Sequence, residues 1–267
     1  MTNAVSRIVI AVPLAALVLF VVYLGGWWVF GLAALAAAIA LHEFWLMARE
    51  LRPLAPAGYV GVALGLLGAQ LGGGGWMLGG LLTTIAVAFL LKAISEARQA
   101  ATIAIGGTVL AAVWIGGGLG SMILLRELPT HGRLALFAVL LAVWAGDTLA
   151  YLGGRLLGRH KMAPMTSPGK TWEGFVFGTA ATVFVVFVAL YKAKPEFLTI
   201  GQSLVLGGVV AVAAPMGDLF ESLLKRDAGV KDSGRLLGGH GGLLDRLDAF
   251  FFAAPAAYWC ILAFGHV

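Results

Sequence analysis

The sequence contains few charged residues. Asp, Glu, Lys and Arg make up 12% of its 267 residues, whereas a soluble globular domain carries about 25%. Because 60% of the residues are hydrophobic, water cannot be the only solvent of this chain. The scarcity of charge therefore excludes an ordinary soluble protein and indicates one that lies mostly in lipid.

Cysteine is almost absent. The single cysteine, Cys260, lies in the last apolar run of the chain. An intramolecular disulfide, a thiol-rich metal site and a redox pair are therefore excluded, and Cys260 is interpreted as a free apolar side chain. Long polar stretches are also missing, which leaves no room for a separate soluble domain. We predict one membrane-embedded domain over residues 1–267.

Apolar runs long enough to cross about 30 Å of hydrocarbon recur along the chain. They predict an all-α, polytopic transmembrane protein. Breaks at Gly, Pro and charged residues place about nine spans, at residues 8–24, 27–47, 58–71, 76–91, 102–125, 134–153, 173–191, 203–220 and 249–265. The third and fourth spans are short, and residues 72–75 between them could instead form the bend of one re-entrant hairpin. Glycine pairs inside spans, such as 106–107, 116–118 and 207–208, predict close helix packing.

Basic residues are unevenly divided between the two sides of these spans. One side keeps only Arg126, Arg133, Lys192 and Lys194, and the other receives the remaining 14 of the 18 Lys and Arg residues. The positive-inside rule then places the N-terminus in the cytoplasm. The net charge of +5 is thus explained by the orientation of the chain in the membrane, and we expect no nucleic-acid partner.

Acidic residues are also few, at 13, but six of them fall within the 31 residues from Asp218 to Asp248. This segment joins the cytoplasmic ends of the last two predicted spans. Carboxylates beside a bilayer are costly unless they meet a cation, and Mg²⁺ carrying nucleotide phosphates is such a partner. The six residues are Asp218, Glu221, Asp227, Asp232, Asp245 and Asp248.

Basic residues and glycines in the same segment complete the pattern of a magnesium-phosphate site. Lys225, Arg226, Lys231 and Arg235 offer donors to phosphate oxygens. The glycine-rich residues 238–242 form a loop whose backbone amides could approach a phosphate closely. A solvated connection rich in salt bridges, with an ordinary glycine turn, is the alternative interpretation.

A second polar segment runs from Asp147 to Glu173. Asp147 falls late in an apolar span, where an ionisable residue is a functional candidate or makes an internal hydrogen bond or ion pair. Lys170 and Thr171 precede the next span, so they either start a helix with Glu173 in its first turn or bind phosphate there. These two interpretations are compatible.

The two polar segments resemble those of the phosphatidate cytidylyltransferase (CDP-diacylglycerol synthase) family. The family's C-terminal signature, S-x-x-K-R, K-D and H-G-G-x-x-D-R-x-D, is matched by Ser222, Lys225, Arg226, Lys231, Asp232, His240, Gly241, Gly242, Asp245, Arg246 and Asp248. The other block is matched by Asp147, Tyr151, Gly153, Ser167, Pro168, Lys170, Thr171, Glu173 and Gly174. One departure is a glycine, Gly238 or Gly239, where many relatives carry proline, which affects the stiffness of the loop.

The resemblance implies that CTP and phosphatidic acid react to CDP-diacylglycerol and pyrophosphate in phospholipid biosynthesis. It further implies dependence on Mg²⁺, K⁺ as a possible second cation at the acidic site, and a homodimer in the cell membrane with the site facing the cytoplasm. An anionic lipid phosphate must attack the α-phosphate of an anionic nucleotide. Positioning and charge neutralisation are therefore the main tasks of the protein.

The resemblance also implies roles for individual residues within the catalytic region 147–248. The expected metal ligands are Asp218, Asp245 and Asp248. The expected catalytic residues are Asp147, Lys170, Lys225, Arg226, Lys231, Asp245 and His240, the last of which is as well explained by a loop-stabilising role. The expected substrate-binding residues are Ser167, Lys170, Thr171, Ser222, Lys225, Arg226, Lys231, Gly241, Gly242 and Arg246.

Three other functions fit a polytopic chain. A CTP-dependent lipid-alcohol kinase would share the membrane fold and the nucleotide, but the signature argues against it. A CDP-alcohol phosphatidyltransferase would need D-G-x-x-A-R, a string that does not occur. A multi-span transporter is expected to show repeated halves with broken helices at the bilayer midplane. Here the polarity gathers near the C-terminus, which favours chemistry on a lipid headgroup.

Overall fold

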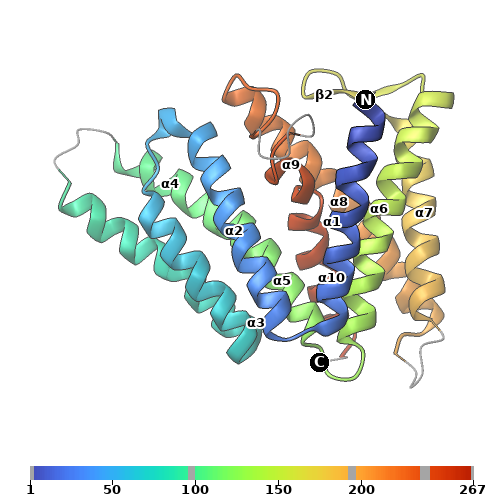
Figure 1. Cartoon of the computed structure of the whole chain (residues 1–267), viewed down its shortest axis with the longest axis horizontal. Coiled ribbons are helices and arrows are strands. Elements are labelled where there is room, and N and C mark those ends of the chain that lie inside the picture. The colour runs from blue at the N-terminus through green and yellow to red at the C-terminus, as the bar shows by residue number, and fades with distance from the viewer. Residues whose placement is uncertain (1–2, 96–99, 192–196, 235–240, 266–267) are drawn as a thin grey trace. The chain divides into compact units, whose positions relative to one another are not determined.

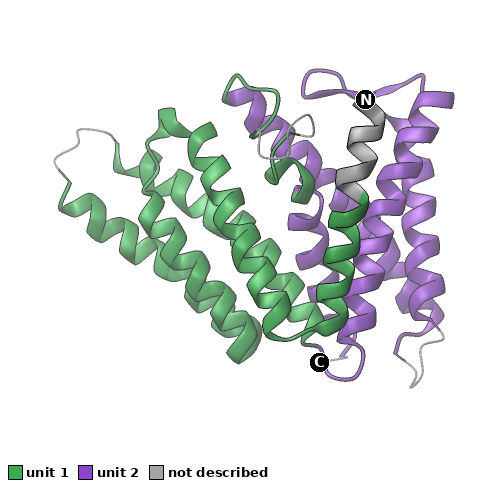
Figure 2. Cartoon of the chain, in the orientation of Figure 1, with its two compact units in different colours: residues 1–127, 228–247 green, residues 128–227, 248–267 purple. Residues whose placement is uncertain are grey.

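A computed structural model describes residues 3–95, 100–191, 197–234 and 241–265, with side chains from residue 12 onward. These residues form two compact units (Figure 2). Unit 1 comprises Met1–Glu127 and Ala228–Leu247, and unit 2 comprises Leu128–Asp227 and Asp248–Val267. The chain passes three times from one unit to the other, and its interpretation as a single domain stays a prediction.

Apolar helices dominate both units. In the part of the chain that the structure describes, seven helical segments are long and apolar enough to cross a membrane: Trp27–Met47 (α2), Ala55–Ala93 (α3), Ala101–Arg126, Gly132–Leu157 (α6), Trp172–Leu190 (α7), Ile200–Asp227 (α8) and Leu244–Ala263. A shorter apolar stretch, Val12–Leu24, belongs to α1 (Asn3–Leu24). The prediction of an all-α, polytopic membrane protein is confirmed. The count of nine spans and the cytoplasmic N-terminus stay predictions.

Unit 1 is built from α1, α2, the short 3₁₀ turn η1 (Arg49–Leu51), α3, a segmented span and α9 (Leu244–Leu247). The segmented span consists of α4 (Ala101–Ala111), the π-helical turn η2 (Ala112–Gly116) and α5 (Gly117–Arg126). Aromatic side chains fill the contact between α2 and this span. Phe44 meets the ring of Trp114 edge-on, with 6.3 Å between the ring centroids.

Helix α3 folds back on itself at Gly73 (Figure 1). Gly73 has φ 77° and ψ −164°, a backbone conformation that side chains other than glycine rarely adopt. Residues 55–72 and 74–93 then pack as antiparallel halves, because Gly61 lies against Thr84 and Gly65 against Leu81. The predicted bend within residues 72–75 is therefore confirmed, and the number of membrane crossings that the two halves make stays a prediction.

Unit 2 is built from α6, a β-hairpin, α7, α8 and α10 (Phe250–Ala263). Helices α6 and α7 lie side by side, and glycine permits their close approach: Gly146 faces Thr182 and Gly178 faces Ala150 (Figure 1). The connection between them is a two-stranded antiparallel sheet of β1 (Lys161–Ala163) and β2 (Ser167–Thr171). The sequence analysis did not predict this sheet.

The predicted packing role of glycine holds in two of the three groups, those at residues 116–118 and 207–208. A Cβ atom on Gly116 would collide with Leu81 and Val62, and one on Gly207 would collide with Val183. Neither Gly106 nor Gly208 has a neighbour close to such an atom. Each helix thus approaches its neighbour through selected glycines.

Candidate active site

The polar residues of unit 2 gather in one cluster, here called the lysine-paired cluster. Helix α6 supplies Asp147, strand β2 supplies Lys170, α8 supplies three side chains, and Asp248, two residues before α10, supplies a carboxylate. Its members are Asp147, Lys170, Asp218, Glu221, Lys225 and Asp248.

Lys170 and Asp218 form an ion pair in this cluster. Lys170 Nζ lies 2.8 Å from Asp218 Oδ2 and also donates to the Pro215 carbonyl oxygen at 3.3 Å. The other carboxylate oxygen of Asp218 accepts from Ser222 Oγ at 3.3 Å. The side chains of Lys170 and Asp218 are 22% and 39% exposed, so an incoming anion can reach this pair.

A second ion pair lies deeper in the unit. Lys225 Nζ donates to Glu221 Oε2 at 2.9 Å, one helical turn away on α8. Glu221 is completely buried and the side chain of Lys225 is 13% exposed. Removing either partner would leave a buried charge uncompensated, which is strongly destabilising.

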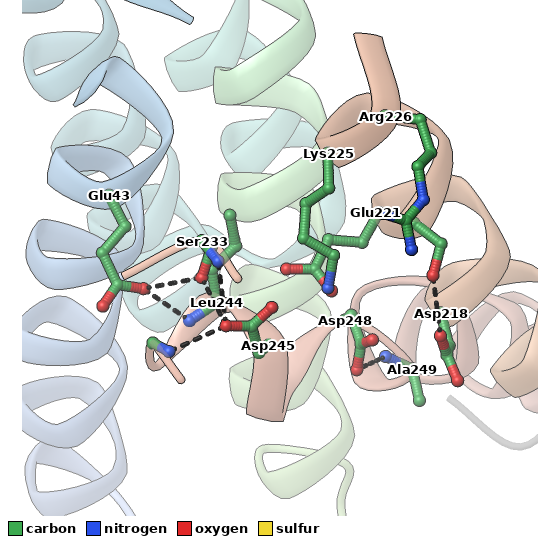
Figure 3. A network of polar contacts seen from close by, with 12 residues as sticks. Glu43, Asp218, Glu221, Lys225, Arg226, Ser233, Leu244, Asp245, Asp248 and Ala249 are labelled. Atoms are coloured by element: carbon green, nitrogen blue, oxygen red, sulfur yellow. Dashed lines mark hydrogen bonds and ion pairs between the residues drawn. The ribbon is translucent and has the colours of Figure 1, made fainter. Parts of the chain in front are cut away.

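The remaining carboxylates of the cluster repel one another. Asp147, Asp218 and Asp248 interact electrostatically in all three pairings, and Lys170 also attracts Asp147. Asp248 Oδ1 accepts from the backbone N–H of Ala249 at 2.7 Å (Figure 3). The cluster thus contains four acidic and two basic side chains, and a bound cation would offset the charge of carboxylates that no lysine pairs.

Glycine at position 217 brings Asp248 to this cluster. A Cβ atom on Gly217 would collide with the backbone carbonyl of Asp248. The segment before α10 can therefore approach α8 closely only because this position carries no side chain. As a result, Asp248 comes within electrostatic reach of Asp218, the next residue on α8.

A small cavity lies beside Asp147 between α6, α7 and α8. It has a volume of about 30 Å³, and its polar lining includes Asp147, Thr179 and Thr182. The hydroxyl of Thr179 is buried and has no hydrogen-bond partner among the described atoms. The cavity has room for a water molecule but not for a nucleotide. A nucleotide would have to approach the cluster from the side on which Lys170 and Asp218 are partly exposed.

The hairpin that carries Lys170 is fixed at both ends. Thr171 is the N-cap of α7, because its Oγ1 accepts from the N–H of Gly174 at 3.1 Å. Glu173 in the first turn of α7 binds His160 Nδ1 at 2.6 Å. Arg226 Nε donates to the Thr166 carbonyl at 3.3 Å, which ties the turn of the hairpin to α8. The predicted helix start at residues 171–173 is confirmed, and phosphate binding there stays a prediction.

Unit 1 holds a different group of polar contacts, here called the amide-held cluster, made of Glu43, Ser233, Gly242, Leu243, Leu244 and Asp245. Asp245 Oδ2 accepts from the backbone N–H of Ser233 at 3.0 Å, from its hydroxyl at 2.9 Å and from Gly242 N–H at 2.7 Å. Figure 3 shows these bonds converging on one carboxylate oxygen. They hold the start of α9 against Ser233.

Along with Ser233, Glu43 is a member of this cluster that sequence reasoning missed. It lies in α2 and is 5% exposed. Its carboxylate accepts from the N–H of Leu243 at 3.0 Å and of Leu244 at 2.8 Å. The signal was present in the sequence, because Glu43 is the one acidic residue of its apolar span. The rule that selected Asp147 as an intramembrane ionisable residue applies equally to Glu43.

The predicted site residues are thus divided between the units. Asp218 and Asp248 lie in unit 2, and Asp245 lies in unit 1. Lys231 and Arg246 are exposed, and His240 lies outside the described residues. Within residues 3–95, 100–191, 197–234 and 241–265, no three His, Cys, Asp or Glu side chains are grouped as a ready-made metal site. The prediction of Mg²⁺ depends on the donor chemistry alone.

Comparison with known proteins places the chain in a family. The sequence pattern of the cytidylyltransferase family matches residues 5–264. This chain belongs to that family. The match spans both units, and it confirms the resemblance inferred from the two polar segments.

Several cytidylyltransferases are similar to this chain. The phosphatidate cytidylyltransferase of Staphylococcus haemolyticus is 34% identical over 238 residues, which cover 88% of this chain and 90% of that protein. The phosphatidate cytidylyltransferase of Synechocystis is 33% identical over 292 residues, with 96% of each chain covered. That of Haemophilus influenzae is 39% identical over 130 residues, which span 48% of this chain and 45% of that protein.

Proposed function

We propose that this chain is a phosphatidate cytidylyltransferase, which forms CDP-diacylglycerol and pyrophosphate from CTP and phosphatidic acid. The observation that carries the proposal is the family match over residues 5–264, supported by relatives of that name that cover nearly the whole chain. The lysine-paired cluster supplies the chemistry that such a reaction needs.

In this reaction a phosphate oxygen of phosphatidic acid attacks the α-phosphorus of CTP. A new P–O bond forms, the bond from the α-phosphorus to the bridging oxygen of the β-phosphate breaks, and pyrophosphate leaves with the electron pair. Both reactants are anions, so the site must hold them together against their repulsion.

Lysine ammonium groups in the cluster suit that task. Lys170 is accessible and is paired with Asp218 through a single contact to Oδ2, so a substrate phosphate can compete for its ammonium group. Arg226 on the exposed end of α8 and Lys231 beyond it offer further donors. Lys225, which is paired with the buried Glu221, supplies fixed positive charge.

A divalent cation fits the chemistry of the acidic side chains. Asp147, Asp218 and Asp248 repel one another, and oxygen ligands are those that Mg²⁺ prefers. Asp218 and Asp248 would hold Mg²⁺, with Asp245 a third candidate from the sequence motif. When bound, Mg²⁺ neutralises part of the triphosphate charge. K⁺ is a further candidate for this acidic site.

The remaining parts of the proposal concern location and assembly. The excess of Lys and Arg on one side of the spans supports a site that faces the cytoplasm from the cell membrane. The family resemblance supports a homodimer.

The decisive experiment uses purified protein, labelled CTP, phosphatidic acid and Mg²⁺. We expect labelled CDP-diacylglycerol and pyrophosphate in equal amounts, and we expect EDTA to stop their formation. Formation of CDP with a phosphorylated lipid would instead identify a lipid kinase, and release of CMP a phosphatidyltransferase. Either of those products, or no turnover, would contradict the proposal.

A further inference from the structure

We propose that Glu43 is a positioning residue, which holds the segment carrying Asp245 from a separate membrane helix. The proposal rests on the proposed function, in which Asp245 is a candidate metal ligand. Glu43 lies in α2, and its hydrogen-bond partners Ser233, Leu243 and Leu244 follow 190 to 201 residues later in the chain.

The start of α9 explains why an outside carboxylate is needed. The first backbone N–H groups of a helix have no acceptor within the helix, and a Ser, Thr, Asp or Asn side chain usually caps them. The residue at the capping position here is Leu243, whose apolar side chain cannot accept a hydrogen bond. Glu43 accepts from the N–H groups of Leu243 and of Leu244, the first residue of α9, and so replaces the missing cap.

Asp245 completes the other half of this arrangement. It lies in the first turn of α9, and its carboxylate accepts from the N–H of Gly242, which precedes the helix, at 2.7 Å. The Ser233 hydroxyl lies 2.9 Å from Asp245 Oδ2 and 3.4 Å from Glu43 Oε2. Ser233 therefore stands between the two carboxylates and couples the position of one to the other.

Two glycines allow the backbone to approach the Glu43 carboxylate closely. A Cβ atom on Gly242 would collide with Glu43 Oε2 and Ser233 Oγ, and one on Gly234 would collide with Glu43 Oε1. Neighbouring atoms therefore fix the carboxylate on several sides. Because α2 is packed into the interior of unit 1, a helix embedded in lipid sets the position of the Asp245 segment.

Loss of the Glu43 charge should release the start of α9 while the spans stay folded. Glu43→Gln keeps the size of the side chain but turns one acceptor into a donor that faces backbone N–H groups. We expect the amides of residues 242–245 to exchange hydrogen at least tenfold faster. We expect kcat to fall about 10- to 100-fold, as for a lost hydrogen bond to a charged group. KM for CTP should change less than threefold.

The matched control is Glu50→Gln, the same chemical change at an exposed residue just beyond α2. Glu50 is paired with Arg49 at 3.6 Å on the surface. It should leave both amide exchange and kcat as in the wild type. Ser233→Ala should give a smaller fall in kcat, and the double variant with Glu43→Gln should lose less than the product of the two single losses.

Three results would overturn the proposal: amide exchange of residues 242–245 as slow in Glu43→Gln as in Glu50→Gln, an unchanged kcat, or faster exchange over the whole of unit 1. The last would mean that Glu43 only stabilises the fold. If Glu43→Gln does not fold, the same two readouts on Ser233→Ala decide the matter. A wild-type protein that makes no CDP-diacylglycerol would remove the proposed function, whereas the exchange measurement would still decide whether Glu43 holds the segment.

Discussion

The carboxylates of the two units are held by different kinds of donor group. In unit 1 the carboxylates of Glu43 and Asp245 accept mostly from backbone N–H groups. In unit 2 Asp218 and Glu221 are paired with the ammonium groups of lysines. A backbone amide at a helix start cannot move away from its acceptor, whereas a lysine side chain can exchange a carboxylate for a phosphate. The amide-held cluster therefore fixes geometry, and the lysine-paired cluster is suited to bind charged ligands.

The largest effect that this comparison predicts is at Asp218. Asp218→Asn removes the charge that is paired with Lys170 and that is a candidate metal ligand, so turnover should fall at least about 100-fold. The formation of CDP-diacylglycerol from labelled CTP measures this. Asp227→Asn, at the exposed end of the same helix, is the control and should keep wild-type turnover.

If Asp218→Asn keeps wild-type turnover, the two clusters do not differ in function. Both would then be structural, and the chemistry would have to lie elsewhere. The melting temperature of the variant separates loss of function from loss of fold, because Asp218 is only half-buried and its substitution should shift that temperature little.

An intermediate effect is expected at Lys170. Lys170→Met removes the accessible ammonium group, and kcat/KM for CTP should fall about tenfold to 100-fold because a charge-assisted phosphate contact is lost. Lys161→Met, on the paired strand β1, changes an exposed lysine in the same hairpin and serves as the control. If Lys161→Met lowers kcat/KM as much as Lys170→Met does, the overall positive charge of the hairpin determines kcat/KM and the Lys170–Asp218 pair has no special role.

The smallest effect is expected at Thr171 and concerns stability. Thr171→Ala removes the N-cap of α7 and should lower the free energy of unfolding by about 1 kcal/mol, which a thermal melt of the detergent-solubilised protein can detect. Thr171→Ser keeps the hydroxyl and should melt as the wild type does. A rise in KM for CTP in Thr171→Ala larger than fivefold would show that Thr171 also contacts substrate.

Much of this architecture could be predicted from the sequence, because apolar runs of membrane-spanning length leave few alternatives to helices. The acidic segment that begins at Asp218 was found by composition alone, since carboxylates are rare elsewhere in the chain. Asp147 was found because an ionisable residue in an apolar span is costly. These signals are local, so a single sequence carries them.

The features that were missed have different causes. Glu43 contacts residues about 200 positions later, and no spacing rule connects α2 with the start of α9. The hairpin of β1 and β2 was missed because the stretch Ser167-Pro168-Gly169 is typical of a loop and strands this short have no periodic pattern. The division of the three predicted metal ligands between two units is likewise a property of the packing.

The fold-back of α3 at Gly73 has a consequence for the biosynthesis of the protein. Residues 53–91, which contain the bend and most of both halves, include no charged side chain. We expect the two halves to enter the bilayer together as a pair, because no charged side chain in this segment has to cross the hydrocarbon. Gly74→Lys would place a charge next to the bend and should reduce the amount of protein recovered in the membrane fraction. Unchanged recovery would show that the halves insert one after the other, with the turn carried across freely.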